Sequence, residues 1–158
     1  MLLVMRHAKS DWSAKTSDHQ RPLSKRGVKA ARRMGKLITD IGLTPDLVIT
    51  STAVRAATTA KLAAEAGRWN CPIRETDDFY ETSVGVVLNE LRELGDEVGT
   101  CLIVGHDTTW SRTVEVLTGA NAAMRTATVA VIDNGASWSR IGNYSCELVA
   151  LLQPRHFT

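Results

Sequence analysis

The chain has 158 residues, of which 44% are hydrophobic and 23% charged, values that are ordinary for a globular protein and unlike those of a disordered tail. This length predicts one domain, residues 1–158, with a sizeable core. The 19 basic and 17 acidic residues nearly balance, so no strong overall field favours nucleic acid or a membrane as partner.

The cysteine pattern argues against a disulfide framework or a structural zinc site. Cys71, Cys101 and Cys146 are odd in number, widely separated and without a C-x-x-C pair. The apolar run at the N-terminus is too short for a signal peptide or a membrane span. We therefore expect a cytoplasmic protein without a membrane partner.

The first 42 residues predict a strand followed by a helix. Residues 2–5 are an apolar run typical of a buried strand, and the run ends at Arg6 and His7, which are costly to bury. Ser24 is expected to cap a helix that Gly42 ends. Arg6 and His7 must therefore either be held by acidic partners or bind an anionic ligand.

The middle of the chain continues this alternation. Residues 45–50 predict a short buried strand. An alanine-rich helix follows, beginning at Ser51 or Thr52 and ending at Gly67, and residues 72–76 predict a further short strand.

Beyond a loop at 77–83, the pattern predicts a helix at 84–95, a strand at 100–104 and another helix at 111–119. Regular alternation of this kind implies parallel strands that are covered by helices.

The last part of the chain has a different pattern. Three extended segments are expected, at 125–133, 137–142 and 146–153, with turn signals between them. We therefore predict an α/β fold, a three-layer αβα sandwich, whose mostly parallel central sheet has an antiparallel portion near the C-terminal end.

Four polar side chains are expected to meet at one edge of this sheet, because ligands of open α/β sheets bind where the strands end and the helices begin. Arg6 and His7 follow the first strand. Arg55 lies in the first turn of the second helix, and His106 comes soon after the strand at 100–104. With no carboxylate evident beside them, these groups favour a doubly charged oxyanion such as phosphate.

Four motifs in this order resemble the histidine phosphatase (phosphoglycerate mutase-like) superfamily, in the short form of the SixA-type phosphohistidine phosphatases. They are "MRHAKS" near the N-terminus, "RPLSKRG" after it, "STAVRAATTA" in the middle and "VGH" later, and they span Met1 to about Trp110. Ala8 stands where the founding motif has glycine. The last third of the chain has no such motif.

The resemblance implies that His7 is a nucleophile whose neutral imidazole attacks phosphorus and forms a phosphohistidine intermediate. Arg6, Arg55 and His106 would bind the phosphoryl oxygens. Glu81 lies in the loop where mutase-type members carry their acid, which makes it the candidate general acid. A phosphohistidine substrate already has a good leaving group and needs no acid. The resemblance implies no metal or other cofactor.

Three further side chains are expected near the mouth of the pocket. Ser10 and Arg21 are candidate substrate-binding residues, and Trp12 is a candidate lining residue. A surface ion pair for Arg21 and a packing role for Trp12 are equally good interpretations. A metal site on His7 and His106 is discounted, because no further ligand has suitable spacing and the arginines would repel a cation.

The leading functional hypothesis is a metal-independent phosphatase that acts on phosphohistidine in proteins or on small phosphomonoesters. One alternative is a phosphoglycerate mutase-like phosphotransferase, for which the chain is short. The other is a non-catalytic phosphate- or phosphoprotein-binding module, which would not need a nucleophile at His7. The basic stretch at 25–33 has few aromatic residues beside it, so no nucleic acid is expected as partner.

Overall fold

A central sheet of apolar strands organises the chain. The computed structural model describes residues 1–135 and 137–157, and the strands in this part form one six-stranded sheet of order β3-β2-β4-β1-β5-β6. The strands are β1 (Leu2–Arg6), β2 (Leu47–Ser51), β3 (Ile73–Thr76), β4 (Cys101–Gly105), β5 (Val129–Asp133) and β6 (Glu147–Leu152). β1 to β4 are mutually parallel, whereas β5 runs antiparallel to β1 and β6. The predicted α/β class and its antiparallel portion are confirmed.

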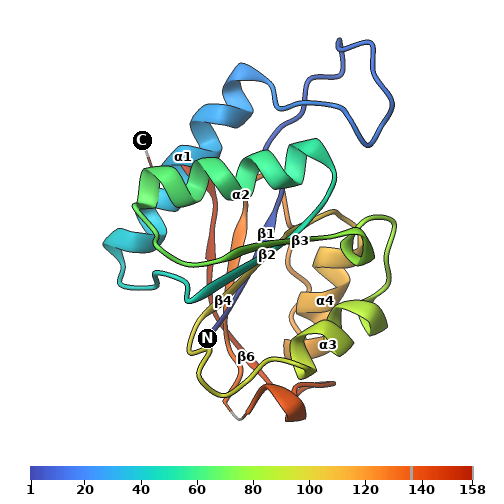
Figure 1. Cartoon of the computed structure of the whole chain (residues 1–158). Coiled ribbons are helices and arrows are strands. Elements are labelled where there is room, and N and C mark those ends of the chain that lie inside the picture. Colours follow the sequence, from blue (N-terminus) through green and yellow to red (C-terminus); the bar gives the residue numbers. More distant parts are fainter. Residues whose placement is uncertain (136, 158) are drawn as a thin grey trace.

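Within the described residues, four α-helices cover the two faces of the sheet. They are α1 (Lys25–Asp40), α2 (Val54–Gly67), α3 (Val84–Arg92) and α4 (Thr109–Thr118). Three single turns of 3-10 helix accompany them, η1 (Asp77–Phe79), η2 (Trp138–Arg140) and η3 (Pro154–His156). α1 and α2 lie on one face and α3 and α4 on the other, which gives the three predicted layers (Figure 1).

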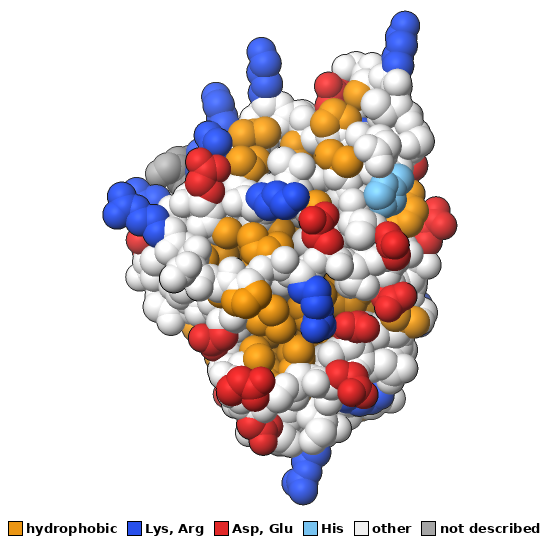
Figure 2. Space-filling view, in the orientation of Figure 1, with side chains coloured by type: hydrophobic (Ala, Val, Ile, Leu, Met, Phe, Trp, Pro, Cys, Tyr) orange, Lys and Arg blue, Asp and Glu red, His pale blue; other side chains and the backbone are white. Residues whose placement is uncertain are grey.

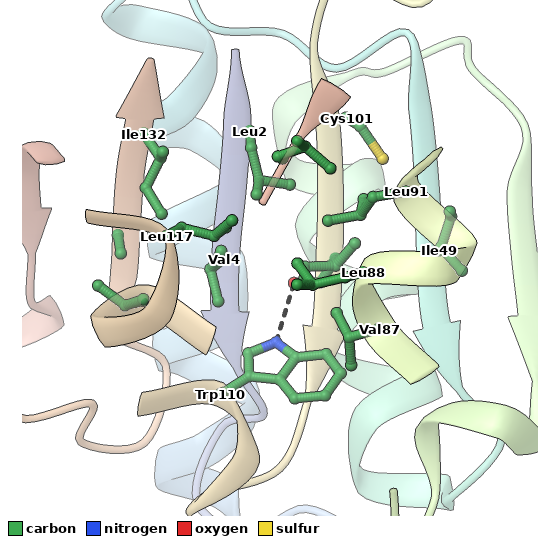
Figure 3. Packing of buried hydrophobic residues seen from close by; sticks show 14 of the residues in the cluster. Leu2, Val4, Ile49, Val87, Leu88, Leu91, Cys101, Trp110, Leu117 and Ile132 are labelled. Carbon is green, nitrogen blue, oxygen red and sulfur yellow. Dashed lines mark hydrogen bonds between the residues drawn. The ribbon is translucent and has the colours of Figure 1, made fainter. Parts of the chain in front are cut away.

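The alternation of side chains along β1 divides the core into two halves. Leu3 and Met5 pack with α1 and α2, whereas Leu2 and Val4 pack with α3 and α4. Figure 3 shows the second half, in which Val4 lies between Leu2 and Trp110, the latter at the start of α4. Because both faces of the strand are buried, β1 has the continuous apolar sequence of a central parallel strand.

The helices α1 and α2 pack closely because α1 carries a glycine at the contact. A Cβ atom on Gly35 would overlap the backbone carbonyl of Ala63 in α2. α1 begins as predicted, with the Ser24 hydroxyl accepting a hydrogen bond from the N–H of Gly27 at 3.1 Å.

Three predicted helix boundaries were wrong, including that of α4, which begins at Thr109 rather than at residue 111. α2 begins at Val54 with Ala53 as N-cap, because Ser51 still pairs with β3 as a strand residue. α3 ends at Arg92 rather than at residue 95.

The extended segment expected at 137–142 was also wrong. It contains the 3-10 turn η2. There Trp138 is buried, and its indole N–H donates to the carbonyl of Val98 at 2.7 Å. The segment that holds this buried side chain forms a 3-10 turn and does not pair with a strand of the sheet.

The surface agrees with the nearly balanced charge. On the face shown in Figure 2, basic and acidic side chains are interspersed with apolar ones. Among the described residues, no helix combines the length and the apolar character needed to cross a membrane.

The contact between α1 and α2 predicts opposite effects for two glycine-to-alanine substitutions. Gly35→Ala should lower the free energy of unfolding by about 1–3 kcal/mol, because the new methyl group overlaps backbone that must shift. Gly85→Ala, in α3 with open space around its Cβ position, should raise it by up to about 1 kcal/mol through helix propensity. Urea denaturation of both variants measures this. A stable Gly35→Ala protein would contradict the close packing.

Candidate active site

The end of β1 is held in place from both sides. The backbone N–H of His7 donates to the carbonyl of Gly105 in β4 at 2.9 Å. On the other side, the N–H of Ala127 donates to the carbonyls of Arg6 and His7, both at 3.1 Å. β1, β2 and β4 are parallel, so their carboxyl ends lie at the same edge of the sheet. His7, Arg55 and His106, which follow these three strands, are therefore at that edge.

Two helices fix the chain that follows His7. The N–H of Ala8 donates to the Thr59 hydroxyl in α2 at 3.0 Å. The carbonyl of Lys9 accepts from the N–H of Ser24 at 2.9 Å and from its hydroxyl at 3.1 Å. A Cβ atom on Gly27 would overlap this same carbonyl, so α1 can approach the loop only with glycine there.

Trp110 supports the end of β4. It is fully buried, and its indole N–H donates to the carbonyl of Ile103 at 3.4 Å (Figure 3). A Cβ atom on Gly105 would overlap the indole ring, and the N–H of Trp110 donates to the carbonyl of His106 at 2.9 Å. The position of His106 therefore depends on the packing of Trp110 in the core.

The structure brings the four predicted side chains together. Arg6, His7, Arg55 and His106 all line one cavity of about 360 Å³. The His7 and His106 rings lie 5.3 Å apart between centroids. His7 and Arg55 are buried, with 7% and 6% of their surfaces exposed. The predicted meeting of these residues at one sheet edge agrees with the structure.

The ring of His7 is fixed in one tautomer. Its Nδ1 lies 2.7 Å from the carbonyl oxygen of Ala8, which can only accept, so Nδ1 carries the proton. Burial lowers the pKa of His7 to about 3, and the neighbouring His106, Arg55 and Arg6 act in the same direction. The imidazole is therefore neutral near pH 7, with its lone pair on Nε2.

His106 is neutral for a similar reason. Burial, and then the charge of Arg55, lower its pKa to about 4. Its Nε2 lies 2.8 Å from the hydroxyl of Ser51.

Asp18 was missed by the sequence analysis and corrects the expectation that no carboxylate adjoins the cluster. It lies in the strap, the segment 11–22 between β1 and α1 (blue, upper right in Figure 1). Arg55 Nη2 pairs with Asp18 Oδ2 at 3.1 Å, and Arg55 Nη1 donates to the Asp18 carbonyl at 2.7 Å. Arg55 therefore has an acidic partner in the strap.

Tyr80 completes this polar group. Its hydroxyl donates to Asp18 Oδ2 at 2.6 Å. The Tyr80 hydroxyl and the guanidinium groups of Arg21 and Arg55 hold the pKa of Asp18 below its usual range, and the same hydrogen bond raises the pKa of Tyr80. Asp18 and Tyr80 lie in loops, where no periodic pattern marks them.

Three buried nitrogens at the site have no hydrogen-bond partner among the described residues. They are Arg6 Nε, Arg55 Nε and His106 Nδ1. Arg6 uses its Nη1 to donate to the carbonyl of Met124 at 2.9 Å. Buried polar groups without partners cost free energy, and an oxyanion that accepts from them would remove this cost. The site can therefore still donate hydrogen bonds to an oxyanion.

The other predicted residues of the mouth lie at the same cavity. Ser10, Trp12 and Arg21 line it. Arg21 is buried, donates from Nε to the Ser10 hydroxyl at 3.0 Å and pairs with Asp18 at 2.8 Å. Its guanidinium carbon lies 3.7 Å from the ring centroid of Trp12, a cation–π contact. These contacts support the structural interpretation of Arg21, while Trp12, 77% exposed, remains at the mouth.

Glu81 lies in a neighbouring cavity of about 210 Å³, exposed at the surface. Arg55 and His106 line both cavities, so Glu81 is close to the four-residue cluster without belonging to it.

Thr59 is a positioning residue that the sequence could have revealed. It follows Arg55 by four residues, so both lie on the same face of α2, and its hydroxyl donates to the Arg55 carbonyl at 2.6 Å. A threonine four residues after Arg55 in an alanine-rich helix was the available signal.

In the part of the chain that the structure describes, no three His, Cys, Asp or Glu side chains are grouped so that they could hold a metal ion. In the lining of the His7 cavity, the cations outnumber the one carboxylate, Asp107, which suits an anion.

Comparison with known proteins gives relatives of similar length and others that are much longer. A protein of Mycobacterium leprae is 33% identical over 96% of this chain and 100% of its own. A 2,3-bisphosphoglycerate-dependent phosphoglycerate mutase of Clavibacter michiganensis is 32% identical over 73% of this chain but only 46% of its own.

Solved structures share the whole architecture. A structure from Agrobacterium tumefaciens, assigned as the phosphohistidine phosphatase SixA, superposes with a TM-score of 0.84 at 25% identity, and 97% of each chain is covered. A second SixA assignment, from Nakamurella multipartitia, gives a TM-score of 0.82 at 27% identity over 97% of this chain and 95% of the other. The sequence model of the histidine phosphatase superfamily (branch 1) matches residues 2–98. The chain therefore belongs to branch 1 of the histidine phosphatase superfamily, whose members here are phosphatases and phosphotransferases, and it has the SixA-type form.

Proposed function

We propose that this protein is a metal-independent phosphatase that uses His7 as nucleophile and acts on phosphohistidine in proteins or on small phosphomonoesters. The hydrogen bond between His7 Nδ1 and the carbonyl of Ala8 is the observation that carries the proposal. It leaves the Nε2 lone pair available in a cavity whose lining is mostly cationic or polar, with Asp107 as its one acidic residue.

The first step is attack on phosphorus. His7 Nε2 forms a bond to phosphorus while the bond from phosphorus to the leaving group breaks. Arg6 and Arg55 stabilise the charge on the phosphoryl oxygens, and His106 donates to a third oxygen. The unpartnered Nε atoms of both arginines supply free donors for this purpose.

The second step is hydrolysis of the intermediate. Water attacks phosphorus, the bond to His7 Nε2 breaks, and the neutral imidazole is regenerated. For an ester substrate, the leaving oxygen takes a proton from the Glu81 carboxyl, and the resulting carboxylate then takes a proton from the attacking water. A phosphohistidine substrate whose other ring nitrogen is protonated leaves as neutral imidazole and needs no proton from Glu81.

A phosphoglycerate mutase-like activity is the second candidate. It is favoured by the sequence identity to the Clavibacter mutase, yet this chain spans less than half of that protein's length. A mutase must retain a bisphosphate while its phosphoryl groups exchange, which favours an enclosed site. The cavity at His7 is lined partly by exposed Trp12 and Lys9, so phosphate transfer to water is the better proposal.

The same proposal includes the setting in which the enzyme works. We propose that residues 1–158 form a single domain, since all strands of the described part belong to one sheet. The three cysteines are free thiols, which suits a reducing cytoplasm. The partner is a phosphorylated protein or a small phosphorylated metabolite.

The nucleophile is tested with His7→Ala. Phosphate release from a phosphohistidine protein and from p-nitrophenyl phosphate is followed in the presence of a chelator. Wild type should release phosphate and form a phosphate adduct on His7 that mass spectrometry detects, whereas His7→Ala should lose roughly 10³-fold or more. His156→Gln, at an exposed histidine outside the site, is the control. Turnover by His7→Ala, or loss of wild-type turnover in chelator, would contradict the proposal.

The role of Glu81 is tested by the leaving group. Glu81→Gln should lower kcat for ethyl phosphate by about 10²-fold, because the alkoxide needs a proton, and leave p-nitrophenyl phosphate nearly unaffected. Asp78→Asn, an exposed carboxylate nearby that lines neither cavity, is the matched control. Equal losses on both esters would show that Glu81 is not the acid.

The buried neutral state of His7 predicts a pH dependence of stability. The folded-state pKa of about 3 lies below the ordinary 6.5, so the unfolded chain binds more protons between these values. The free energy of unfolding should fall as the pH drops from about 7 to about 4.5, with His7 contributing a slope approaching about 1.4 kcal/mol per pH unit. Denaturation of His7→Gln should show a shallower slope than wild type and His156→Gln. Identical slopes in all three would contradict a buried neutral His7.

A further inference from the structure

A second cavity opens beside the one that contains His7. Its volume is about 380 Å³, and residues of α1, of the loop before β5 and of the segment after β6 line it. Arg6, Lys9 and Thr126 line both cavities. A group in the second cavity therefore lies next to a phosphate bound at Arg6.

The charge of this second cavity has one sign. No acidic side chain lines it, and its basic residues are Arg6, Lys9, Arg26, Arg125 and Arg155. Within residues 1–135 and 137–157, none of the five forms an ion pair, in contrast to Arg21 and Arg55, which share Asp18. Cations gathered without counter-charge make a potential that attracts an anion.

Buried polar atoms in the cavity also lack partners. Thr128 is fully buried and Gln153 is 9% exposed, and both line the cavity. In the described part of the chain, Thr128 Oγ1, Gln153 Oε1 and Arg6 Nε have no hydrogen-bond partner. Of these three atoms, the Thr128 hydroxyl and Arg6 Nε are able to donate to an oxyanion, whereas Gln153 Oε1 can only accept. This second observation, independent of the surface charge, points to the same ligand.

The cavity that holds Glu81 has more acidic than basic lining residues. Asp18 and Asp107 also line it, and its one cation, Arg55, is paired with Asp18. An anionic substituent of the substrate is therefore repelled from that side and attracted to the side of α1.

We propose that the second cavity binds a second anionic group of the substrate, a carboxylate or a phosphate, close to the phosphate that is removed. This inference rests on the proposed phosphatase function and names its substrate class. Substrates with a second negative charge beside the scissile phosphate are preferred over those with none. The second charge comes either from a small metabolite or from an acidic side chain next to a phosphohistidine.

The preference is measured with two matched substrate pairs. Phosphoglycolate carries a carboxylate where ethyl phosphate has a methyl group, and one phosphohistidine peptide carries Asp on both sides of the histidine where the other carries Asn. The ratio of kcat/KM within each pair is compared between wild type and Arg26→Gln/Arg125→Gln. Arg32→Gln/Lys36→Gln removes two exposed charges from α1 outside the cavity and is the control.

The charged member of at least one pair should be favoured by wild type, and Arg26→Gln/Arg125→Gln should reduce this ratio about tenfold or more, while the control retains it. A preference for phosphoglycolate alone identifies a small substrate, and one for the Asp peptide alone identifies a protein. Wild type without a preference in either pair, or a preference that Arg26→Gln/Arg125→Gln keeps, overturns the inference.

A binding measurement separates this inference from the proposed function. Inorganic phosphate is titrated into the full chain, and NMR follows the side-chain amide of Gln153 and the rings of His7 and His106. The Gln153 signal should shift, with about tenfold weaker binding in Arg26→Gln/Arg125→Gln than in wild type and the control. Ring shifts without a Gln153 shift overturn the second site alone. If the rings do not shift and the protein shows no turnover, the phosphatase proposal is overturned. The Gln153 signal then still shows whether the second cavity binds an anion.

Discussion

The arrangement at the sheet edge depends on keeping one imidazole neutral among cations. His7 is buried next to Arg6 and Arg55. A second proton would give its ring a positive charge that is both desolvated and repelled by these arginines. The carbonyl of Ala8 holds the remaining proton on Nδ1. Burial and the neighbouring charges favour the neutral ring and outweigh the hydrogen bond to Ala8, which by itself raises the pKa of His7. The tautomer that this hydrogen bond selects leaves Nε2 as a nucleophile before any substrate arrives.

The backbone around His7 is held as firmly as its ring. Hydrogen bonds connect it to β4 through Gly105 and to the residues before β5 through Ala127, while Thr59 of α2 binds the next residue. Each of these partners belongs to a different element. The geometry of the nucleophile is thus a consequence of the whole sheet and of the helix that packs on it, and Trp110 extends the same dependence to His106.

Charge is distributed unevenly around the cavity. In the strap, Asp18 pairs with both Arg55 and Arg21 and accepts from Tyr80, so part of the positive charge already has a partner. A phosphate that enters the cavity therefore binds an Arg55 side chain that is already paired with Asp18. On the side of α1, the basic residues have no such carboxylate. The cations near the strap thus have a carboxylate partner, whereas those on the side of α1 have none. This difference favours a substrate whose second anionic group points towards α1.

Much of this protein could be predicted from its sequence, because the determining signals are local. Apolar runs bounded by helix caps indicated the layers and the parallel strands. Arg6, His7, Arg55 and His106 each stand at a strand-to-helix junction, where topology alone brings side chains together.

Other features depend on contacts between distant segments, which no local pattern records. The carboxylate partner of Arg55 comes from the strap, 37 residues earlier, and the turn at Trp138 exists because its indole binds Val98. The basic cavity joins α1, the loop before β5 and the C-terminal segment. The sequence by itself determined the layers and the four residues at the sheet edge, and only the tertiary structure decided which of their charges are neutralised, since that depends on which loops pack beside them.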